Sequence, residues 1–478
     1  MQKEPRLSEA KQRLLEIQRR GGLAPAAPAA SEAKRRSRET PSPLSLAQEQ
    51  VWRLDQIAAK HAPLHNESIT IHRHGPCDLA ALEAGLAEIV RRHEIWRTTF
   101  ELVDGQPVQI VHHAPATFKL PVADLTTLPE CDREKTALDL ATQDASRPFD
   151  LKHGPLFRAR LVSLDDARHR LYLTAHQCIV DGITVFDIFP SELTTLYESF
   201  AAGKPSPLPP LETQYADFAD WQRQTVIGEA LDKQLSYWQD RLAGDLPTLP
   251  WPNQGARPAQ QTFRGALHPF KLTQELTESL RELGRREGAT LFMILLAGLA
   301  ALLHRYTRQP DIVVGTLAPS GRKQNAYQRL MGYFLNPVAL RTNLSGDPSF
   351  SSLLSQTREV TLSAISNDDV PLQLIAERLH LVPDSSRSLF FTVALSVAPA
   401  VPQLPSGWSM TYMDVESGGA RWDLYLELND RPGGMIGRAQ YNPDLFTTAS
   451  ITQTLEDLQS LLEKIVADPA QRIGAKIS

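Results

Sequence analysis

The residues best placed to do chemistry follow a strand-like run at residues 169–174 and are His176, Gln177, Asp181 and Gly182. A histidine can exchange a proton near neutral pH, whereas a glutamine amide can only donate and accept hydrogen bonds. Successive residues of a strand point to opposite faces, so His176 and Gln177 are predicted to face opposite sides of their sheet. This short stretch therefore predicts a polar site in which Gln177 either orients a reactant or stabilises an oxyanion, and transfers no proton.

Other reactive side chains are weaker candidates. His112 and His113 are adjacent, but Ala-Pro follows them and they read as an exposed strand end. His72 and His74 fall on one face of a predicted strand, yet no third ligand is evident, so no metal site is predicted. Cys178 falls on the strand face opposite to the glutamine before it, which favours a packed core thiol over a Cys-His nucleophile.

The composition excludes several function classes. The 478 residues carry a net charge of -5, and the one basic segment, residues 1–40, has ten Lys and Arg against five Glu without interleaved aromatics. No nucleic-acid partner is therefore predicted. The chain has three widely spaced cysteines, which indicate neither a disulfide framework nor a zinc site.

The longest apolar run, residues 291–303, is too short to span a bilayer and reads as a buried helix with Thr290 as its N-cap. The N-terminus lacks the apolar core of a signal peptide. No membrane association is expected, and the predicted location is cytoplasmic.

Three segments are predicted along the chain. Residues 1–40 hold one short helix and a Pro/Ala linker, which form either a plain tether or a docking segment for an upstream protein. Residues 41–222 and 223–478 each alternate strand and helix signals, and one long helix at residues 215–242 is expected to join them. The predicted class is α/β, with two lobes of similar build.

Six motifs occur in a fixed order across residues 43–446. They are Ser-Leu-Ala-Gln-Glu-Gln-Val-Trp at 45–52, Arg-His-Glu-Ile-Trp-Arg-Thr-Thr-Phe at 92–100, His-Gln-Cys-Ile-Val-Asp-Gly at 176–182, Tyr-Ala-Asp-Phe-Ala-Asp-Trp-Gln at 215–222, Met-Gly-Tyr-Phe-Leu-Asn-Pro at 331–337 and Asn-Asp-Asp-Val-Pro-Leu at 367–372. This series resembles the condensation domain of nonribosomal peptide synthetases and of hybrid polyketide-peptide synthetases. In that family the third motif reads His-His-x-x-x-Asp-Gly, and here the second histidine is replaced by Gln177.

The resemblance implies a fold of two chloramphenicol-acetyltransferase-like lobes in a V-shaped pseudo-dimer with a central tunnel. It implies an acyltransferase that forms an amide between an acyl or peptidyl thioester on an upstream carrier protein and an aminoacyl thioester on a downstream peptidyl carrier protein. The substrates would arrive on phosphopantetheine arms, with no cofactor bound by the domain itself. Adjacent synthetase modules would be the other partners.

Residue roles follow from the resemblance at the matching positions. Asp181 would be structural and would pair with Arg92 or Arg97, because an unpaired buried carboxylate costs several kcal/mol. Gly182 would let the chain turn from strand to helix, and His176 would support the loop.

Two residues of the second half are candidates for the tunnel by the same resemblance. Asn336 belongs to the fifth motif, and Trp422 lies in a strand-like run that resembles the family's Phe-Asp-Leu element. We expect Trp422 to form either the wall on the acceptor side or part of the core.

Gln177 stands at the position where the family carries its usual catalytic histidine. A general base contributes roughly 10²–10⁴-fold to a rate, but an α-amine with a pKa of about 7.7–8.0 is already partly unprotonated at neutral pH. Amide synthesis could therefore proceed by positioning alone. Two alternatives remain open: an impaired domain that serves carrier docking or gating, and a freestanding acyltransferase that uses a small soluble acceptor.

Overall fold

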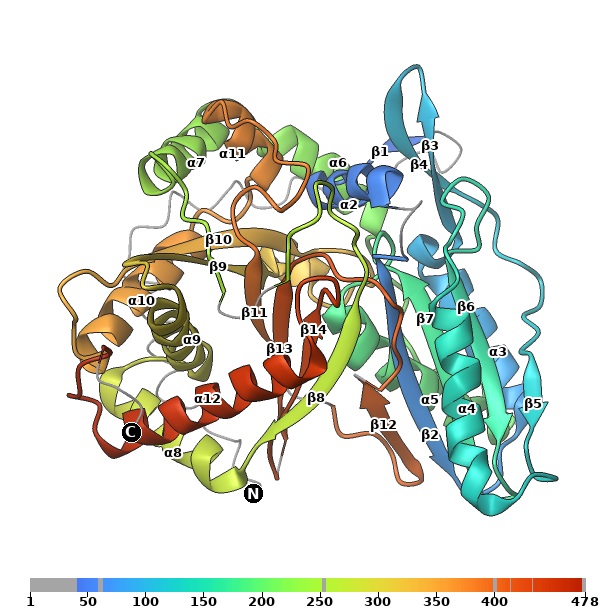
Figure 1. Cartoon of the computed structure of the whole chain (residues 1–478). Helices are drawn as coiled ribbons and strands as arrows, with labels where there is room; N and C mark the ends of the chain where they lie inside the picture. Colours follow the sequence, from blue (N-terminus) through green and yellow to red (C-terminus); the bar gives the residue numbers. More distant parts are fainter. Residues whose placement is uncertain are drawn as a thin grey trace, which may run out of the picture.

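The computed structural model describes residues 41–58, 63–251, 255–398, 402–412, 414–431 and 433–474. The short helix and linker predicted within residues 1–40, with their docking role, lie outside the described residues. Over the described part, the chain forms two α/β lobes side by side, each built on a central mixed sheet (Figure 1).

The first lobe is built on a five-stranded sheet. Its strands are β2 (Asn66–His74), β5 (Val122–Asp124), β6 (Phe157–Ser163), β7 (Arg168–His176) and β12 (Trp408–Tyr412), in the order β12-β2-β7-β6-β5. Its helices are α3 (Leu79–Arg92), α4 (Glu130–Ala145) and α5 (Phe189–Ala201). The apolar side chains of β2 and β7 alternate: Ile69 and Leu171 pack toward α3 and α5, whereas Tyr172 packs toward α4. This alternation places helices on both faces of the sheet.

A small hairpin and one further helix complete this lobe. Strands β3 (Thr98–Val103) and β4 (Gln106–Val111) pair antiparallel, with β1 (Ser42–Pro43) on the outer edge of β4 and α2 (Leu46–Ala58) following it. The strand predicted over residues 106–111 is confirmed. Its turn, Asp104-Gly105, has φ of 50° and 76°, the left-handed conformation that tight hairpins require.

The second lobe is built on a six-stranded sheet. Its strands are β8 (Ala266–Leu272), β9 (Asp311–Ala318), β10 (Asn336–Asn343), β11 (Val393–Ala398), β13 (Leu424–Arg431) and β14 (Gly434–Tyr441), in the order β10-β9-β11-β13-β14-β8. Its helices are α8 (Gln274–Glu287), α9 (Leu291–Thr307), α10 (Phe350–Ile365), α11 (Leu372–Arg378) and α12 (Thr448–Ala467). Helices α8, α9, α10 and α12 pack against the sheet and enclose the larger of the two main cores.

Helix α9 matches its sequence prediction. Thr290 caps it by accepting a hydrogen bond from the Met293 amide, every residue from Met293 to Leu303 is buried, and α8 ends at Gly288 with φ 63°. Among the described residues no single helix is long and apolar enough to cross a membrane. Helices α8 and α9 together reach that length and apolar composition, but they are bent by 101° relative to each other. A helix that is apolar all round, as α9 is, belongs in the core of a large domain.

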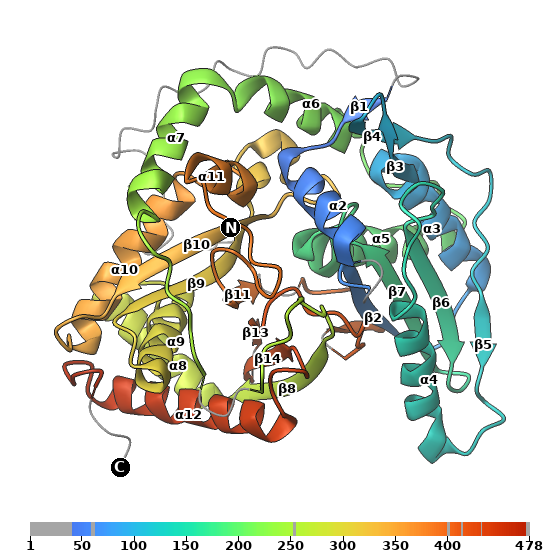
Figure 2. The same ribbon diagram turned by 45° about the horizontal axis from the view of Figure 1, so that its top comes forward.

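The connection between the lobes differs from the prediction. The single helix expected at residues 215–242 is two helices, α6 (Tyr215–Thr225) and α7 (Gly228–Arg241), which pass over the top of both lobes (Figure 2). The helices are separated because Gly228 has a left-handed φ of 56°, which a continuous helix does not allow. The position at which the lobes were divided, residue 222, falls inside α6.

Strand β12 crosses from the second half of the chain into the first lobe. It pairs antiparallel with β2, from Trp408 opposite Arg73 to Tyr412 opposite Ile69. His72 and His74, which stack on one face of β2, hydrogen-bond to Thr411 and Ser409 of β12. The two lobes are therefore joined both over the top, through α6 and α7, and through a shared sheet.

Candidate active site

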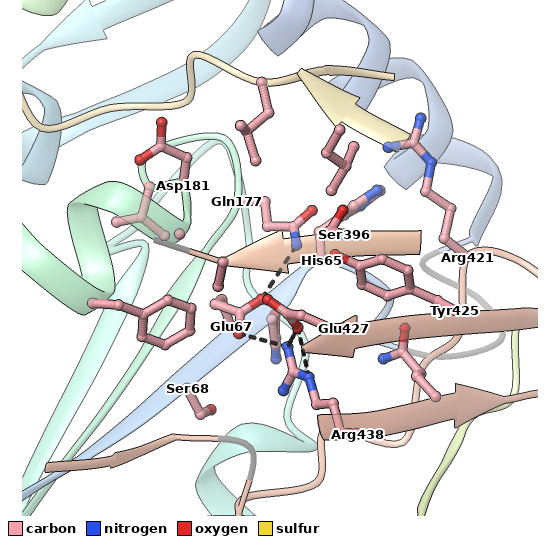
Figure 3. A pocket seen from close by; sticks show the side chains of 18 of the residues that line it. His65, Glu67, Ser68, Gln177, Asp181, Ser396, Arg421, Tyr425, Glu427 and Arg438 are labelled. Carbon is pink, nitrogen blue, oxygen red and sulfur yellow. Dashed lines mark hydrogen bonds and ion pairs between the residues drawn. The ribbon is translucent and has the colours of Figure 1, made fainter. Parts of the chain in front are cut away.

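A cavity of about 170 Å³ lies between the two lobes. Figure 3 shows that its polar side chains come from both central sheets. Among them are Glu67 and Ser68 of β2, Gln177 just after β7, Ser396 of β11, Tyr425 and Glu427 of β13, and Arg438 of β14. The end of the first-lobe sheet thus meets the inner face of the second-lobe sheet at a cavity lined with hydrogen-bonding groups.

Gln177 faces this cavity, and its two sequence neighbours do not line it. Its backbone amide donates to the carbonyl of His65 at 2.8 Å, and its side-chain Nε2 lies 3.5 Å from Oε2 of Glu67. Cys178 is fully buried in the first-lobe core, where burial raises the pKa of its thiol well above the ordinary value. The alternation expected from the sequence therefore holds, and Cys178 is not a nucleophile.

His176 holds the loop in place from behind. Its Nδ1 accepts the backbone N–H of Cys178 at 3.2 Å, and its Nε2 lies 3.3 Å from Oδ1 of Asp55 on α2. An imidazole that accepts at Nδ1 carries its proton on Nε2 when neutral, so Nε2 donates to the carboxylate. Both ring nitrogens of His176 therefore make structural hydrogen bonds, and its side chain does not line the cavity.

Asp55 also accepts from a second histidine, His65, whose Nδ1 lies 3.2 Å from the same oxygen. Burial alone would raise the pKa of Asp55, but the hydrogen bonds from His176 and His65 lower it below its usual range. Complete burial lowers the pKa of His65 to about 4 despite that hydrogen bond. One side-chain N or O atom from each of the three residues lies within 4.8 Å of the other two, and both histidine nitrogens are at ordinary hydrogen-bond distances from the carboxylate.

Asp181 anchors the loop to the second lobe. Its carboxylate accepts from Arg322 Nε at 3.0 Å and Nη2 at 2.8 Å, from the Thr184 amide at 2.7 Å and from the Phe334 amide at 3.3 Å. The Asp181 side chain is fully buried and that of Arg322 is 5% exposed. This is a bidentate, desolvated ion pair whose other hydrogen-bonding groups are also satisfied.

The partners predicted for Asp181 were wrong. Arg92 pairs with Glu192 of α5 at 3.3 Å, and Arg97 lies 3.6 Å from Glu94. Arg92 ends α3 and Arg97 follows it, both within the first lobe, whereas the carboxylate of Asp181 points across to residues 320–334 of the second lobe. Arg322 follows β9 and reaches Asp181 only because the two lobes are packed together.

Comparison with known proteins identifies the family. The model of the condensation domain matches residues 38–476, which is nearly the whole chain. The chain belongs to the condensation-domain family. Condensation domains are transferases that form amides between carrier-bound substrates, so the function expected from the six motifs is the general activity of this family.

Individual relatives agree with this assignment. The chain is 38% identical over 438 residues to one of the proteins that make up the linear gramicidin synthase of Brevibacillus parabrevis, over 91% of this chain and 6% of that protein. It is 34% identical over 472 residues to the phosphinothricin tripeptide synthetase PhsC of Streptomyces viridochromogenes, over 98% of this chain and 43% of that protein. The chain therefore spans less than half of either synthetase.

Solved structures confirm the predicted fold. The X-domain from teicoplanin biosynthesis superimposes with a TM-score of 0.81 at 28% identity, over 93% of this chain and all of that one. The first condensation domain of the calcium-dependent antibiotic synthetase, at 22% identity, has a TM-score of 0.77 over 91% of this chain and 99% of that one. The expected pair of chloramphenicol-acetyltransferase-like lobes is thus the fold of this condensation domain.

Gly182 does not play the part predicted for it. It is not among the glycines with positive φ, and a Cβ built there would lie 3.6 Å from the Phe186 ring, an ordinary contact. Gly182 lines the cavity, so its missing side chain leaves room there. A glycine that does need its conformation is Gly332, with φ 154° and the Tyr215 ring 2.0 Å from where a Cβ would stand.

The two tunnel candidates of the second lobe, Asn336 and Trp422, differ in whether they line the cavity. Asn336 does not line the cavity: its Nδ2 donates to the carbonyls of Asp368 and Val370 at 2.7 and 2.8 Å, and its Oδ1 accepts from Gln50. Its amide is used to hold two second-lobe segments together and to tie them to α2. Trp422 does line the cavity and is also packed core, 5% exposed against the rings of Phe391 and Tyr425.

Sequence reasoning missed a charged group in the cavity, formed by Glu67, Glu427 and Arg438. Arg438 lies 3.0 Å from Glu67 of the first lobe and 2.8 Å from Glu427 of its own lobe. Burial raises the pKa of Glu427, and burial also lowers that of Arg438, but the two carboxylates hold the pKa of Arg438 above its ordinary value. The signal in the sequence was a lone Glu427 inside the apolar run of β13.

Proposed function

We propose that this chain catalyses amide bond formation between an acyl or peptidyl thioester on an upstream carrier protein and an aminoacyl thioester on a downstream carrier protein. Both substrates would arrive on phosphopantetheine arms, with the carriers and adjacent synthetase modules as partners. The free cysteines Cys77, Cys131 and Cys178 are compatible with the cytoplasm, where we place the reaction.

The observation that carries this proposal is the cavity between the lobes, which keeps a polar group, Gln177, at the family's histidine position. The loop that presents Gln177 is fixed by Asp181 and Arg322 on one side and by His176 and Asp55 on the other. Holding a free amine against a thioester can replace much of the rate enhancement that a general base contributes, because it raises the effective concentration of the amine at the thioester.

In the proposed reaction the amine nitrogen forms a bond to the thioester carbon, and the carbon-sulfur bond of the donor breaks. The nitrogen loses one proton, and the leaving pantetheine thiolate gains one. Gln177 binds the amine through a hydrogen bond and transfers no proton, since its amide does not titrate.

A binding module without chemistry is the second candidate, and the observation that favours it is Gln177 itself. The two functions are distinguished by loading a donor carrier with an acyl group and an acceptor carrier with an amino acid and mixing both with the full chain. The intact mass of each carrier is then measured by mass spectrometry. We expect the acyl mass to move to the acceptor carrier. Carrier binding without any transfer would leave the docking role standing and refute the enzyme. Transfer to a small free amine but not to the carrier-bound one would favour the freestanding acyltransferase.

A further inference from the structure

Glu67 is an ionisable group whose side chain contacts the residue at the family's histidine position. It lies on β2 opposite Ala175 of β7, one residue from the pair formed by Asn66 and His176. Figure 3 shows its carboxylate in the cavity, with one oxygen toward Gln177 and the other toward Arg438. The side chain is 14% exposed, so the carboxylate is largely desolvated and still reachable from the cavity.

The hydrogen bond between the two side chains fixes how Gln177 is turned. A carboxylate only accepts, so the Gln177 atom that lies 3.5 Å from Glu67 must be the amide nitrogen. The carbonyl Oε1 of Gln177 then has no hydrogen-bond partner among the described residues. It is available to accept an N–H from a ligand in the cavity.

Glu67 shares its ion-pair partner with a second carboxylate. Arg438 is shared by Glu67 and Glu427, two carboxylates for one guanidinium. Other ionisable groups at the cavity include Arg421, whose guanidinium lies 5.0 Å from the Trp422 ring, Asp181, which is paired with Arg322, and His65, which burial keeps neutral at pH 7. Most of an α-amine, with a pKa of about 7.7–8.0, is an ammonium ion at neutral pH, so the carboxylate has a cation to attract.

We propose that Glu67 replaces the missing histidine as the group that handles the proton of the acceptor amine, an inference that rests on the proposed amide synthesis. Glu67 holds the Gln177 amide so that Oε1 accepts one N–H of the free amine while the nitrogen lone pair attacks the thioester carbon. Once the carbon-nitrogen bond has formed, the nitrogen is positively charged and acidic. The Glu67 carboxylate takes its proton, the carbon-sulfur bond breaks, and the proton passes to the leaving thiolate.

This order of events favours an amine over an alcohol as the acceptor of the acyl group. The proton leaves after attack, from a nitrogen that has become acidic, so a carboxylate suffices as its acceptor. An alcohol must lose its proton as it attacks, which demands more of a carboxylate that is already bound by an arginine. The mechanism therefore favours an amine over an alcohol as the acceptor.

The test is the single-turnover transfer rate between loaded carriers at saturating acceptor. Glu67→Gln removes the charge and keeps the size, and Arg438 stays paired with Glu427, so the fold should persist. We expect the rate to fall about a hundredfold, the lower range for a lost proton acceptor, with the acceptor KM changed less than the rate. Glu67→Asp should recover at least a tenth of the parent rate. Glu67→Gln combined with Gln177→His should also recover, because the new histidine can take the proton itself.

Two control variants exclude a purely electrostatic or structural effect. Glu49→Gln removes a carboxylate that is 20% exposed, bound by two arginines and not part of the cavity lining, and its transfer rate should equal that of the parent. Glu427→Gln removes the other carboxylate from Arg438 and leaves the contact to Gln177 in place. The fold reduction in its transfer rate should be less than a tenth of that in Glu67→Gln.

The outcomes are distinct. An active parent whose rate is unaffected by Glu67→Gln overturns the role of Glu67 and leaves amide synthesis standing. Equal losses in Glu67→Gln and Glu427→Gln, or no recovery with Gln177→His, reduce Glu67 to a structural ion pair between the lobes. A parent chain that binds both carriers and transfers nothing refutes the proposed function and this inference together.

Discussion

Replacing Asp181 with alanine is expected to lower the free energy of unfolding by about 3–5 kcal/mol, the cost of removing one partner of a buried ion pair. The guanidinium of Arg322 would stay in the interior without its carboxylate, since its side chain is only 5% exposed. The amides of Thr184 and Phe334 would lose their acceptor as well. Urea unfolding of the parent and the variant measures this loss.

The same experiment has an internal control on a neighbouring aspartate. Asp187 pairs with Arg329 at 3.3 Å, but the arginine is 59% exposed, so Asp187→Ala should cost less than about 1 kcal/mol. If Asp181→Ala does not yield folded protein, the double variant with Arg322→Met should, because it leaves no orphaned charge. A loss below about 1 kcal/mol for Asp181→Ala, or a double variant no better than the single one, would contradict the anchoring role.

Lowering the pH from about 7.5 to about 5 is expected to reduce stability by about 2 kcal/mol through His65 alone. Burial holds the pKa of His65 at about 4 in the folded chain, against 6.5 as its ordinary value. Between these values the unfolded chain binds a proton that the folded chain does not, so stability falls as the pH drops through this window. Below about pH 4 both states are protonated and this loss is complete.

Urea unfolding at the two pH values, with His65→Gln as the matched variant, measures this dependence. Burial also lowers the pKa of His72 to about 4, so some acid sensitivity should remain in the variant. The variant should lose about 2 kcal/mol less than the parent over this interval. Equal losses in the two proteins would show that His65 is not kept neutral by burial.

The sequence predicted those parts of the site that lie close together in the chain. The opposite orientations of His176 and Gln177 followed from strand alternation, and the need of Asp181 for an arginine followed from the cost of a buried charge. The fold class followed from six motifs read in order, and α9 with its Thr290 cap followed from local signals.

The parts that were missed depend on contacts between the lobes. Arg322 lies 141 residues beyond Asp181, and nothing local in either segment marks the pair. Glu67 and Arg438 lie 371 residues apart and meet only because the two sheets face one cavity. Strand β12 joins the opposite lobe through β2, a pairing that depends on the tertiary arrangement.

The central claim is that Gln177 positions the acceptor amine in a working condensation domain, and the transfer rate of Gln177→Ala tests it most directly. Carriers loaded with donor and acceptor are mixed with parent or variant, and the transferred acyl group is followed by intact-protein mass, with thermal unfolding as the check on the fold. The account predicts a loss of about tenfold, the scale of one neutral hydrogen bond of roughly 0.5–1.5 kcal/mol. A loss of about a thousandfold in a folded variant, the scale of a lost general base, would contradict it. An unchanged rate would contradict it equally, because Gln177 would then be a bystander.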